Sequence, residues 1–398
     1  MVELLAPAKN ITSLQAAIQN KANSIYIGIE DHNMRANMKT FKQEELPKIT
    51  KLCHENNVKL YLCTNTIMTN DSIKKLEKQL DFFEKTKIDA LIISDLGAIN
   101  IAQNTNIPLH MSIQANTSNY QALNFLEKHN ITRAILSREL NLKQIKEIKK
   151  ESPIEIETFI HGAMCMAISG RCFLSQYFDN KSANCGKCLQ HCRKEWTIQS
   201  QDKTLQIETP YEDTYKNRLL SPKDLCMIEH IPELIDAKID AFKIEGRAKS
   251  PDYVATVVNT YNQAIKAYEN NTWNETKINK WKKQLKTVFN RGFDTGFYYK
   301  TPYKTSKDNK STEQKIDIGQ VENYYKNIKV AEIKLWSTLE INDKIIIQGN
   351  KTGSITQTVK SMQINKKSIT KAKNQNIGLK IDKQVRKSDH VYKIIKRK

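Results

Sequence analysis

The chain has 398 residues, 39% of them hydrophobic, which is enough for one large domain and a smaller one. No apolar run approaches the roughly 20 residues that a membrane-spanning helix needs. The opening residues, MVELLAPAKN, lack the basic and apolar regions of a secretory signal, so we expect a cytoplasmic protein without a membrane partner. Because cytoplasmic thiols stay reduced, the eight cysteines favour metal binding or catalysis over disulfides.

The positive charge is concentrated near the C-terminus. The whole chain carries a net charge of +20, and residues 301–398 contain 22 Lys and Arg against 9 Asp and Glu, a net +13. A basic region attached to a more balanced body is typical of proteins that bind nucleic acid. The alternative is a solvated, lysine-rich surface without a partner.

Short apolar runs alternate with longer helical patterns over the first 250 residues. Stretches such as 10–20 and 72–85 have apolar residues at helical spacing, which together with the runs predicts βα units and a parallel sheet. The eight runs cover residues 3–8, 24–29, 59–64, 90–95, 108–114, 133–138, 154–162 and 241–247. Eight runs predict a TIM-like (β/α)8 barrel, an α/β fold, with an open doubly wound sheet as the alternative.

Polar residues stand where these predicted strands end. In a (β/α)8 barrel the active groups lie at the carboxyl ends of the strands. The polar side chains at those ends belong to Asp95, Gln114, Arg138, Glu139, His161, Glu245 and Arg247. Any one of them could be a loop residue or a helix cap, but together they indicate a barrel mouth that binds a polar, anionic ligand.

We expect three parts along the chain. Residues 1–250 form the barrel domain, with an insertion over residues 163–240 that is too long for a simple connection between strand and helix. Residues 251–310 form a helical extension. Residues 311–398 show short alternating strands at 316–321, 328–335, 343–347 and 390–395, which predict a small antiparallel β-barrel.

Five of the eight cysteines fall in one stretch of 28 residues inside the insertion. They are Cys165, Cys172, Cys185, Cys188 and Cys192. Clustered thiolates bind soft metals, and the spacing alone suits either tetrahedral zinc, completed by Cys192 or His191, or an iron–sulfur cluster. Basic neighbours would favour the thiolate form, and Gly162, Gly170 and Gly186 permit tight turns.

The three other cysteines have the character of core residues. Cys53 falls in a predicted helix and Cys63 in a predicted strand. Cys226 falls in the pattern DLCMIEHI, which predicts a helix.

Longer segments carry a resemblance to a known family. The runs ETFIHGAMC at 157–165 and SGRCFLS at 169–175 resemble the signature of the collagenase-like peptidase family U32. The opening 28 residues, the run GKCLQHCR at 186–193, the block 220–254 and NRGFDTGF at 290–297 are similar to further segments of that family. The resemblance extends over nearly the whole chain.

The resemblance implies a [4Fe-4S] cluster on Cys165, Cys172, Cys188 and Cys192. Cys185 has no counterpart in the family pattern, which leaves open whether Cys185 or Cys188 binds iron. Studied members of the family hydroxylate a wobble uridine of tRNA by a prephenate-linked route, a cytidine of ribosomal RNA or a ubiquinone precursor. The basic C-terminal region resembles the RNA-modifying branch, and the overall layout resembles the tRNA uridine C5 hydroxylases.

The resulting hypothesis is an iron–sulfur enzyme that modifies tRNA. Arg138, Lys243 and Arg247 would hold an anionic co-substrate such as prephenate, because guanidinium groups pair with carboxylates. Candidates for proton transfer are Glu157, His161 and Glu245, although these charged side chains could form salt bridges at the barrel mouth instead. An electron-donor protein is a further expected partner.

Two alternatives remain open from the sequence. One is a U32-type peptidase, although no nucleophile elbow, HExxH helix or Ser/His/Asp set is evident. The other is a non-catalytic RNA-binding protein with a structural metal.

Overall fold

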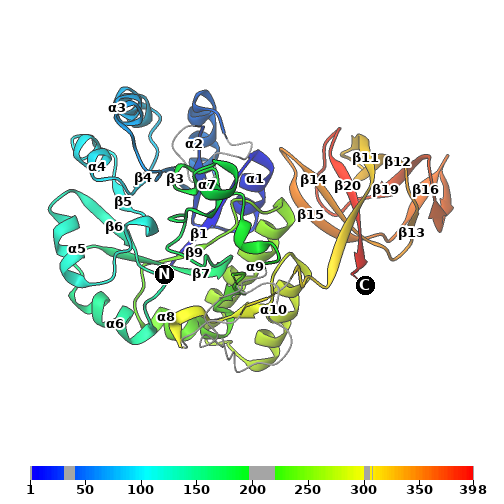
Figure 1. The fold of residues 1–398 in the computed structure, drawn as a ribbon. Helices are drawn as coiled ribbons and strands as arrows, with labels where there is room; N and C mark the ends of the chain where they lie inside the picture. The colour runs from blue at the N-terminus through cyan, green and yellow to red at the C-terminus, as the bar shows by residue number, and fades with distance from the viewer. Residues whose placement is uncertain (1, 31–40, 197–219, 300–304, 307, 398) are drawn as a thin grey trace.

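The computed structural model describes residues 2–30, 41–196, 220–299, 305–306 and 308–397. A parallel barrel forms its larger part, and an antiparallel sheet follows toward the C-terminus (Figure 1). Each part has a hydrophobic core of its own.

Eight parallel strands close into the barrel. They are β1 (Glu3–Pro7), β2 (Ser24–Gly28), β3 (Lys59–Thr64), β4 (Ala90–Ile93), β5 (Leu109–Met111), β6 (Ile131–Ile135), β7 (Glu155–Gly162) and β9 (Ala241–Ile244). Neighbours in this order pair with one another, and β9 pairs with both β7 and β1, which closes the ring. The predicted (β/α)8 barrel is therefore confirmed, and the open-sheet alternative is wrong.

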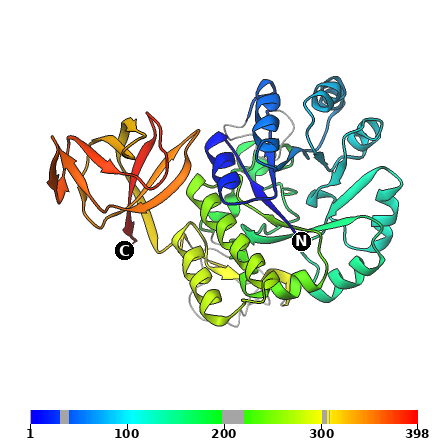
Figure 2. The ribbon, with the colours of Figure 1, turned by 180° about the vertical axis from the view of Figure 1, so that it is seen from behind.

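Helices cover the outside of the ring because parallel strands are buried on both faces (Figures 1 and 2). They are α1 (Ile11–Gln19), α2 (Leu46–His54), α3 (Asn70–Lys85), α4 (Leu96–Ala102), α5 (Tyr120–Glu127), α6 (Leu142–Glu151), α8 (Ile231–Asp236), α9 (Pro251–Glu269) and α10 (Glu275–Thr287). Side chains of Asn10, Asn119 and Asn141 cap the first turns of α1, α5 and α6. None of the described helices is long and apolar enough to span a bilayer.

The long segment between β7 and β9 forms small elements of its own. The helix α7 (Leu174–Asp179) is followed by β8 (Asp224–Cys226), which runs antiparallel to β7, and β10 (Phe293–Asp294) pairs with β8. Cys226 therefore lies in a strand and not in the predicted helix. Cys226 pairs with His161 in the antiparallel ladder between β8 and β7. Pairing with the end of β7 therefore outweighed the local helical pattern of apolar residues.

The C-terminal part is an antiparallel sheet of eight strands in the order β15-β14-β20-β11-β12-β19-β16-β17. These strands are β11 (Glu313–Tyr325), β12 (Val330–Leu335), β14 (Lys344–Gly349), β15 (Gly353–Thr358), β16 (Met362–Ile364), β17 (Lys367–Ile369), β19 (Asn376–Lys380) and β20 (His390–Lys396). A separate pair joins β13 (Leu339–Glu340) to β18 (Lys371–Ala372). We call this part the C-terminal module.

The C-terminal module contacts the barrel through α1 and α9 (Figures 1 and 2). Thr12 Oγ1 donates to Asn350 Oδ1 at 2.8 Å. Asp252, at the start of α9, forms an ion pair with Lys315 at 2.5 Å and accepts from Gln348 at 3.0 Å. Polar contacts thus attach the module beside the barrel.

A buried ionic network occupies the amino-terminal end of the barrel. Arg133, 3% exposed, donates to both carboxylate oxygens of Glu3 and to Glu157. Ser24 and Tyr61 also donate to Glu3, at 2.7 and 2.8 Å. Burial opposes the charge on Glu3, but Arg133 and these hydroxyl groups outweigh it and lower the pKa of Glu3 from 4.5 to about 2.

We predict that Glu3→Gln removes part of the acid sensitivity of folding. The pKa of Glu3 is lower in the folded state, so its stabilisation is complete above pH 4.5 and is lost as the pH falls toward 2. The shift corresponds to on the order of 3 kcal/mol. Urea unfolding from pH 7 to 2 should show a shallower acid limb for Glu3→Gln than for wild type, whereas the exposed control Glu44→Gln should match wild type. Identical limbs for Glu3→Gln and wild type would contradict the prediction.

Candidate functional site

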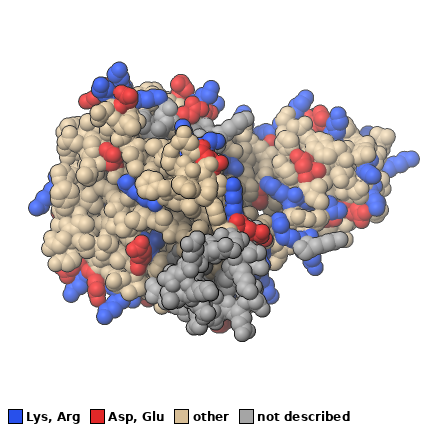
Figure 3. Space-filling view, viewed as in Figure 1, with Lys and Arg blue, Asp and Glu red and all other residues tan. Residues whose placement is uncertain are grey.

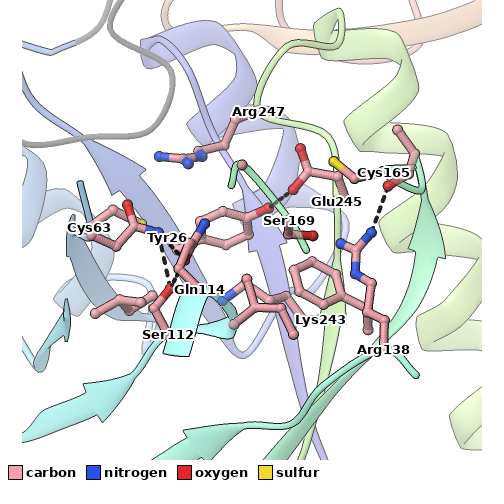
Figure 4. A pocket seen from close by; sticks show the side chains of 16 residues that line it. Tyr26, Cys63, Ser112, Gln114, Arg138, Cys165, Ser169, Lys243, Glu245 and Arg247 are labelled. Atoms are coloured by element: carbon pink, nitrogen blue, oxygen red, sulfur yellow. Dashed lines mark hydrogen bonds between the residues drawn. The ribbon is translucent and has the colours of Figure 1, made fainter. Parts of the chain in front are cut away.

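A cavity lies at the carboxyl ends of the barrel strands (Figure 4). Its wall combines strand ends, the loops that follow them and the start of the cysteine-rich segment. The lining residues are Tyr26, Cys63, Asn65, Ile92, Ser112, Ile113, Gln114, Arg138, Phe159, Ala163, Cys165, Ser169, Gly170, Lys243, Glu245 and Arg247. This is the position where (β/α)8 barrels carry their active sites.

Three cations line this cavity, as the sequence predicted for Arg138, Lys243 and Arg247 (Figure 4). The Arg138 guanidinium lies 3.8 Å from the Phe159 ring centroid and donates to the Ala163 carbonyl at 2.8 Å. Lys243 Nζ and the Arg247 guanidinium lie 4.6 and 5.5 Å from the centroid of the Tyr26 ring. Aromatic faces thus pack against all three cations, which give the cavity wall a positive character.

Among the described residues that line the cavity, Glu245 is the only one with a carboxylate. Tyr26 donates to it at 3.4 Å. The close approach of β7 to this residue requires a glycine, because Gly162 has φ +105° and an added Cβ would lie 2.3 Å from the Glu245 carbonyl oxygen. Of the three predicted proton-transfer groups, Glu245 is the one that the structure places in the cavity.

Glu157 lies below the cavity and not in its wall. Its side chain is fully buried, with Lys243 at 2.7 Å and Arg133 at 3.4 Å. The predicted role of Glu157 in proton transfer to a ligand does not fit this position, because its carboxylate is already paired with Lys243 and Arg133. Glu157 instead holds Lys243 in place beneath the cavity.

His161 points away from the cavity. The register of β7 against β9 shifts between Phe159 and His161, and this extra residue reverses the side-chain alternation. His161 is 2% exposed, lies 3.2 Å from the Tyr261 hydroxyl and contacts the rings of Tyr253 and Phe293. Burial and the charge of Lys249 lower the pKa of His161 to about 3. The predicted role of His161 in proton transfer at the barrel mouth therefore does not fit its buried position. The sequence could not reveal this, because side-chain alternation along a strand carries no sign of the register shift.

Four cysteines gather beside the cavity, and Cys165 is part of its wall. Burial raises the pKa of the Cys192 thiol, Arg193 opposes that change, and the neighbouring thiols of Cys165, Cys188 and Cys172 raise it further. The thiols of Cys165, Cys172 and Cys188 therefore lie in the neighbourhood of Cys192. Cys185 is exposed, whereas Cys165, Cys172, Cys188 and Cys192 are partly buried.

The cysteine segment is tied to the barrel by buried polar contacts. Arg193 donates to the Ser221 hydroxyl at 3.1 Å, to the Pro222 carbonyl at 2.8 Å and to the Met164 carbonyl. The backbone N–H of Leu174 donates to Cys172 Sγ at 3.5 Å. A positive charge and an N–H donor directed at sulfur both stabilise thiolates, so the surroundings suit an anionic metal cluster.

Zinc was the second metal that the cysteine spacing allowed. Among the described residues, no three His, Cys, Asp or Glu side chains are placed so that one ion could bind them all. The His191 ring is bonded to Asp179 and so is engaged elsewhere. A tetrahedral zinc site needs four donors around one point, whereas each thiolate of a cubane binds a different iron. The described residues therefore do not present a ready tetrahedral zinc site.

Sequence reasoning missed several lining residues and misplaced others. Cys63 was taken as a core residue and Tyr26 was given no role, yet both line the cavity, since a barrel strand presents alternate side chains to the interior. Asn65 and Ser112 directly follow β3 and β5, and their place after a strand was the available signal. Among the predicted ring of polar residues, Asp95 caps α4 by accepting from Ala98 N at 3.2 Å, and Glu139 lies outside this cavity.

The fold and the site together define a (β/α)8 barrel protein with a cationic mouth and a four-cysteine cluster at its edge. The family model of peptidase family U32 matches residues 9–308. The chain belongs to this family.

Relatives of the chain carry two kinds of name. An uncharacterized protease of Methanocaldococcus jannaschii is 46% identical over 98% of each chain, and a collagenase of Porphyromonas gingivalis is 39% identical over 99% of this chain and 98% of its own. A tRNA hydroxylation protein P1 of Bacillus subtilis is 31% identical over 98% of this chain and 94% of its own. A solved U32 peptidase structure matches with 11% identity and a TM-score of 0.42, covering 61% of this chain and 92% of that one.

We predict that His161 stays neutral in the folded protein across pH 4–8. The unfolded side chain takes up a proton near pH 6.5 whereas the folded one does so near 3, so stability should fall as the pH decreases from 6.5 toward 3. NMR of histidine-labelled protein would follow the ring directly. His161→Gln should lack this part of the pH dependence of unfolding, and a His161 titration midpoint near 6.5 would contradict the prediction.

Proposed function

We propose that this chain is an iron–sulfur-dependent RNA-modifying enzyme that hydroxylates C5 of a uridine in the tRNA anticodon loop by a prephenate-linked route. The observation that carries the proposal is one juxtaposition. Cys165 of the four-cysteine cluster lines the same cavity as Arg138, Lys243 and Arg247. A metal cluster, an anion site and a pocket at the barrel mouth thus share one wall.

Cys165, Cys172, Cys188 and Cys192 would hold a [4Fe-4S] cluster, which when bound supplies electron transfer beside the cavity. Arg138 and Arg247 bind and orient the carboxylates of an anionic co-substrate, because guanidinium groups pair with carboxylates in two-bond contacts. Lys243, fixed by Glu157 at 2.7 Å, adds positive charge to the same wall. Glu245 is the group positioned to hold or move a proton at its carboxylate oxygen.

The charge distribution supports an RNA partner. Residues 301–398 carry a net +13. On the face shown in Figure 3, Lys and Arg side chains are frequent over the C-terminal module and along its boundary with the barrel. A base in an anticodon loop is already unstacked, so it can enter a pocket at small energetic cost. The Bacillus subtilis relative that aligns with 98% of the chain is named a tRNA hydroxylation protein.

A peptidase is the second candidate, favoured by the names of the Methanocaldococcus and Porphyromonas relatives. The cavity argues against it. The described residues of its wall include the nucleophile candidates Cys63, Ser112, Cys165 and Ser169, but no histidine among them could activate these groups. Burial raises the pKa of the Cys63 thiol, which is the opposite of nucleophile activation.

We predict that protein purified without air contains about four irons and four sulfides per chain and absorbs visible light. Cys188→Ser and Cys192→Ser should each lose most of this iron. The matched control is Cys185→Ser, which removes an exposed thiol outside the cluster and should retain the metal. A colourless protein with one tightly bound zinc would contradict the iron–sulfur assignment.

The activity itself is tested by mass spectrometry of tRNA nucleosides from a strain that lacks this gene. Loss of a hydroxylated uridine, restored by wild type and Cys185→Ser but not by Cys188→Ser, is the expected result. Unchanged nucleosides together with peptide cleavage that persists in Cys188→Ser would establish the peptidase instead. Unchanged nucleosides with retained tRNA binding would indicate a non-catalytic RNA-binding protein.

We also predict salt-sensitive tRNA binding that depends on the cleft between the barrel and the C-terminal module. Lys383 and Arg397 line this cleft. Each lost phosphate contact should weaken binding severalfold and reduce the slope of log Kd against log salt by about 0.7–0.9. Fluorescence anisotropy of labelled tRNA with Lys383→Gln and Arg397→Gln measures this effect. Lys51→Gln, an exposed change on α2, is the control, and equal slopes for all proteins would refute the prediction.

A further inference from the structure

The short helix α7 presents two aromatic side chains to solvent (Figure 1). Phe173 is 74% exposed and Tyr177 is 83% exposed, the highest values among the aromatic side chains of the described residues. The Tyr177 N–H donates to the Phe173 carbonyl at 2.8 Å, so the two residues are one helical turn apart. Residues four apart on a helix are neighbours on the same face. We call Phe173 and Tyr177 the aromatic pair.

The other side of α7 is packed against the cysteine segment. The Ser175 hydroxyl accepts from the Leu189 N–H at 3.0 Å, and Ser175 is 2% exposed. The Phe178 ring contacts the rings of His191 and Trp196, with centroids 5.4 and 5.0 Å apart. These contacts hold the helix in place, so the aromatic pair lies on a supported surface.

Exposed apolar side chains are concentrated in this segment. Six of the fifteen large apolar side chains that are exposed in the described part of the chain lie between residues 166 and 189. They belong to Met166, Ile168, Phe173, Tyr177, Phe178 and Leu189. Single exposed apolar residues are normal on a protein surface, whereas a concentration of them indicates a binding surface.

The surroundings of the aromatic pair are positively charged. Residues 163–196 contain five Lys and Arg against two Asp and Glu. Arg171, Lys181 and Lys187 are exposed, whereas the Asp179 carboxylate is bonded to His191. Aromatic faces among cations are the features with which proteins bind single-stranded nucleic acid, because rings stack on bases and cations meet phosphates. The exposed rings favour RNA over an acidic protein, which the charge alone would also suit.

The aromatic pair lies close to the rim of the cavity. Gly170 lines the cavity, and Phe173 follows it by three residues, which span at most about 11 Å of chain. Between them, Arg171 donates to the carbonyl of Gln114, another lining residue, at 3.2 Å. A strand that delivers one base to the cavity would therefore bring its next nucleotides to this surface.

We propose that the aromatic pair stacks on unpaired RNA bases next to the nucleotide that enters the cavity, while Arg171, Lys181 and Lys187 meet the adjoining phosphates. This inference rests on the proposed function and adds the surface that binds the loop around the target base. Stacking on an aromatic ring tolerates any base, since every base has a π face. The pair thus selects unpaired loops over duplex RNA, whose bases are already stacked on one another.

The test measures Kd by fluorescence anisotropy for the full-length, metal-loaded protein. The two probes are a hairpin RNA with an unpaired loop and a fully paired duplex of the same length. Phe173→Leu and Tyr177→Leu keep an apolar side chain but remove the stacking face. Each should weaken hairpin binding at least about fivefold, the lower end for one lost base–aromatic stack, and leave duplex binding and the salt slope as in wild type.

Matched controls separate stacking from other effects. Phe125→Leu makes the same change at an exposed position on α5 and should bind both RNAs like wild type. Tyr177→Phe keeps the ring and should also match wild type. A hairpin whose loop nucleotides lack bases should bind wild type and Tyr177→Leu equally, since it offers nothing to stack. Iron content and thermal unfolding check each variant, and Tyr177→Leu carries the test if Phe173→Leu, next to Cys172, loses metal.

The outcomes separate this inference from the function on which it rests. Unchanged hairpin affinity in both leucine variants overturns the role of the aromatic pair while RNA binding by wild type stands. Equal losses on hairpin and duplex also overturn it, because a duplex offers no free base face. Unchanged RNA affinity with lost binding of an acidic electron-transfer protein, such as a ferredoxin, would assign the surface to a protein partner. Failure of wild type to bind either RNA at low salt overturns the proposed function and this inference together.

Discussion

The buried carboxylate of Glu157 links the two ends of the barrel. It contacts Arg133, which belongs to the ionic network with Glu3 at the amino-terminal end, and Lys243, which lines the cavity at the other end. A charge with no exposure must be paired, since an isolated buried ion is costly. The pairing therefore fixes Lys243 in a cavity wall that is otherwise shaped by aromatic rings. Glu157, which the sequence suggested as a proton-transfer group, therefore supports the site in the folded chain by holding Lys243.

Strand β7 organises the remaining features of the site. Its irregular register sends Phe159 into the cavity and turns His161 toward α9. Its end at Gly162 allows the backbone to approach Glu245, which no side chain would permit. The chain then enters the cysteine segment directly, so Cys165 reaches the cavity within a few residues. A local change in one strand thus sets which groups meet the ligand and which pack behind it.

The names of the relatives divide between proteolysis and tRNA hydroxylation, and these two activities require different chemical groups. Amide hydrolysis needs an activated nucleophile or a metal-bound water. The wall instead offers aromatic faces, cations, two amides and one thiol of a four-cysteine cluster. These groups support our proposal of a planar base and an anionic partner bound beside a metal cluster. The basic C-terminal module would then provide affinity for the phosphate backbone, which carries no base specificity of its own.

The sequence by itself determined the barrel, its strand order and the segment that carries the cysteines. Continuous apolar runs at eight places leave few other ways to bury that surface, and the basic C-terminal quarter is visible from composition. Only the tertiary structure decided the roles of individual side chains. The outward turn of His161, the internal pairing of Glu157 and the strand at Cys226 all depend on register and on partners distant in the chain. The exposed position of Cys185 and the hydrogen bond between Asn65 and Gln114 have the same origin, because hydrogen bonds and burial between distant segments leave no local periodic signal.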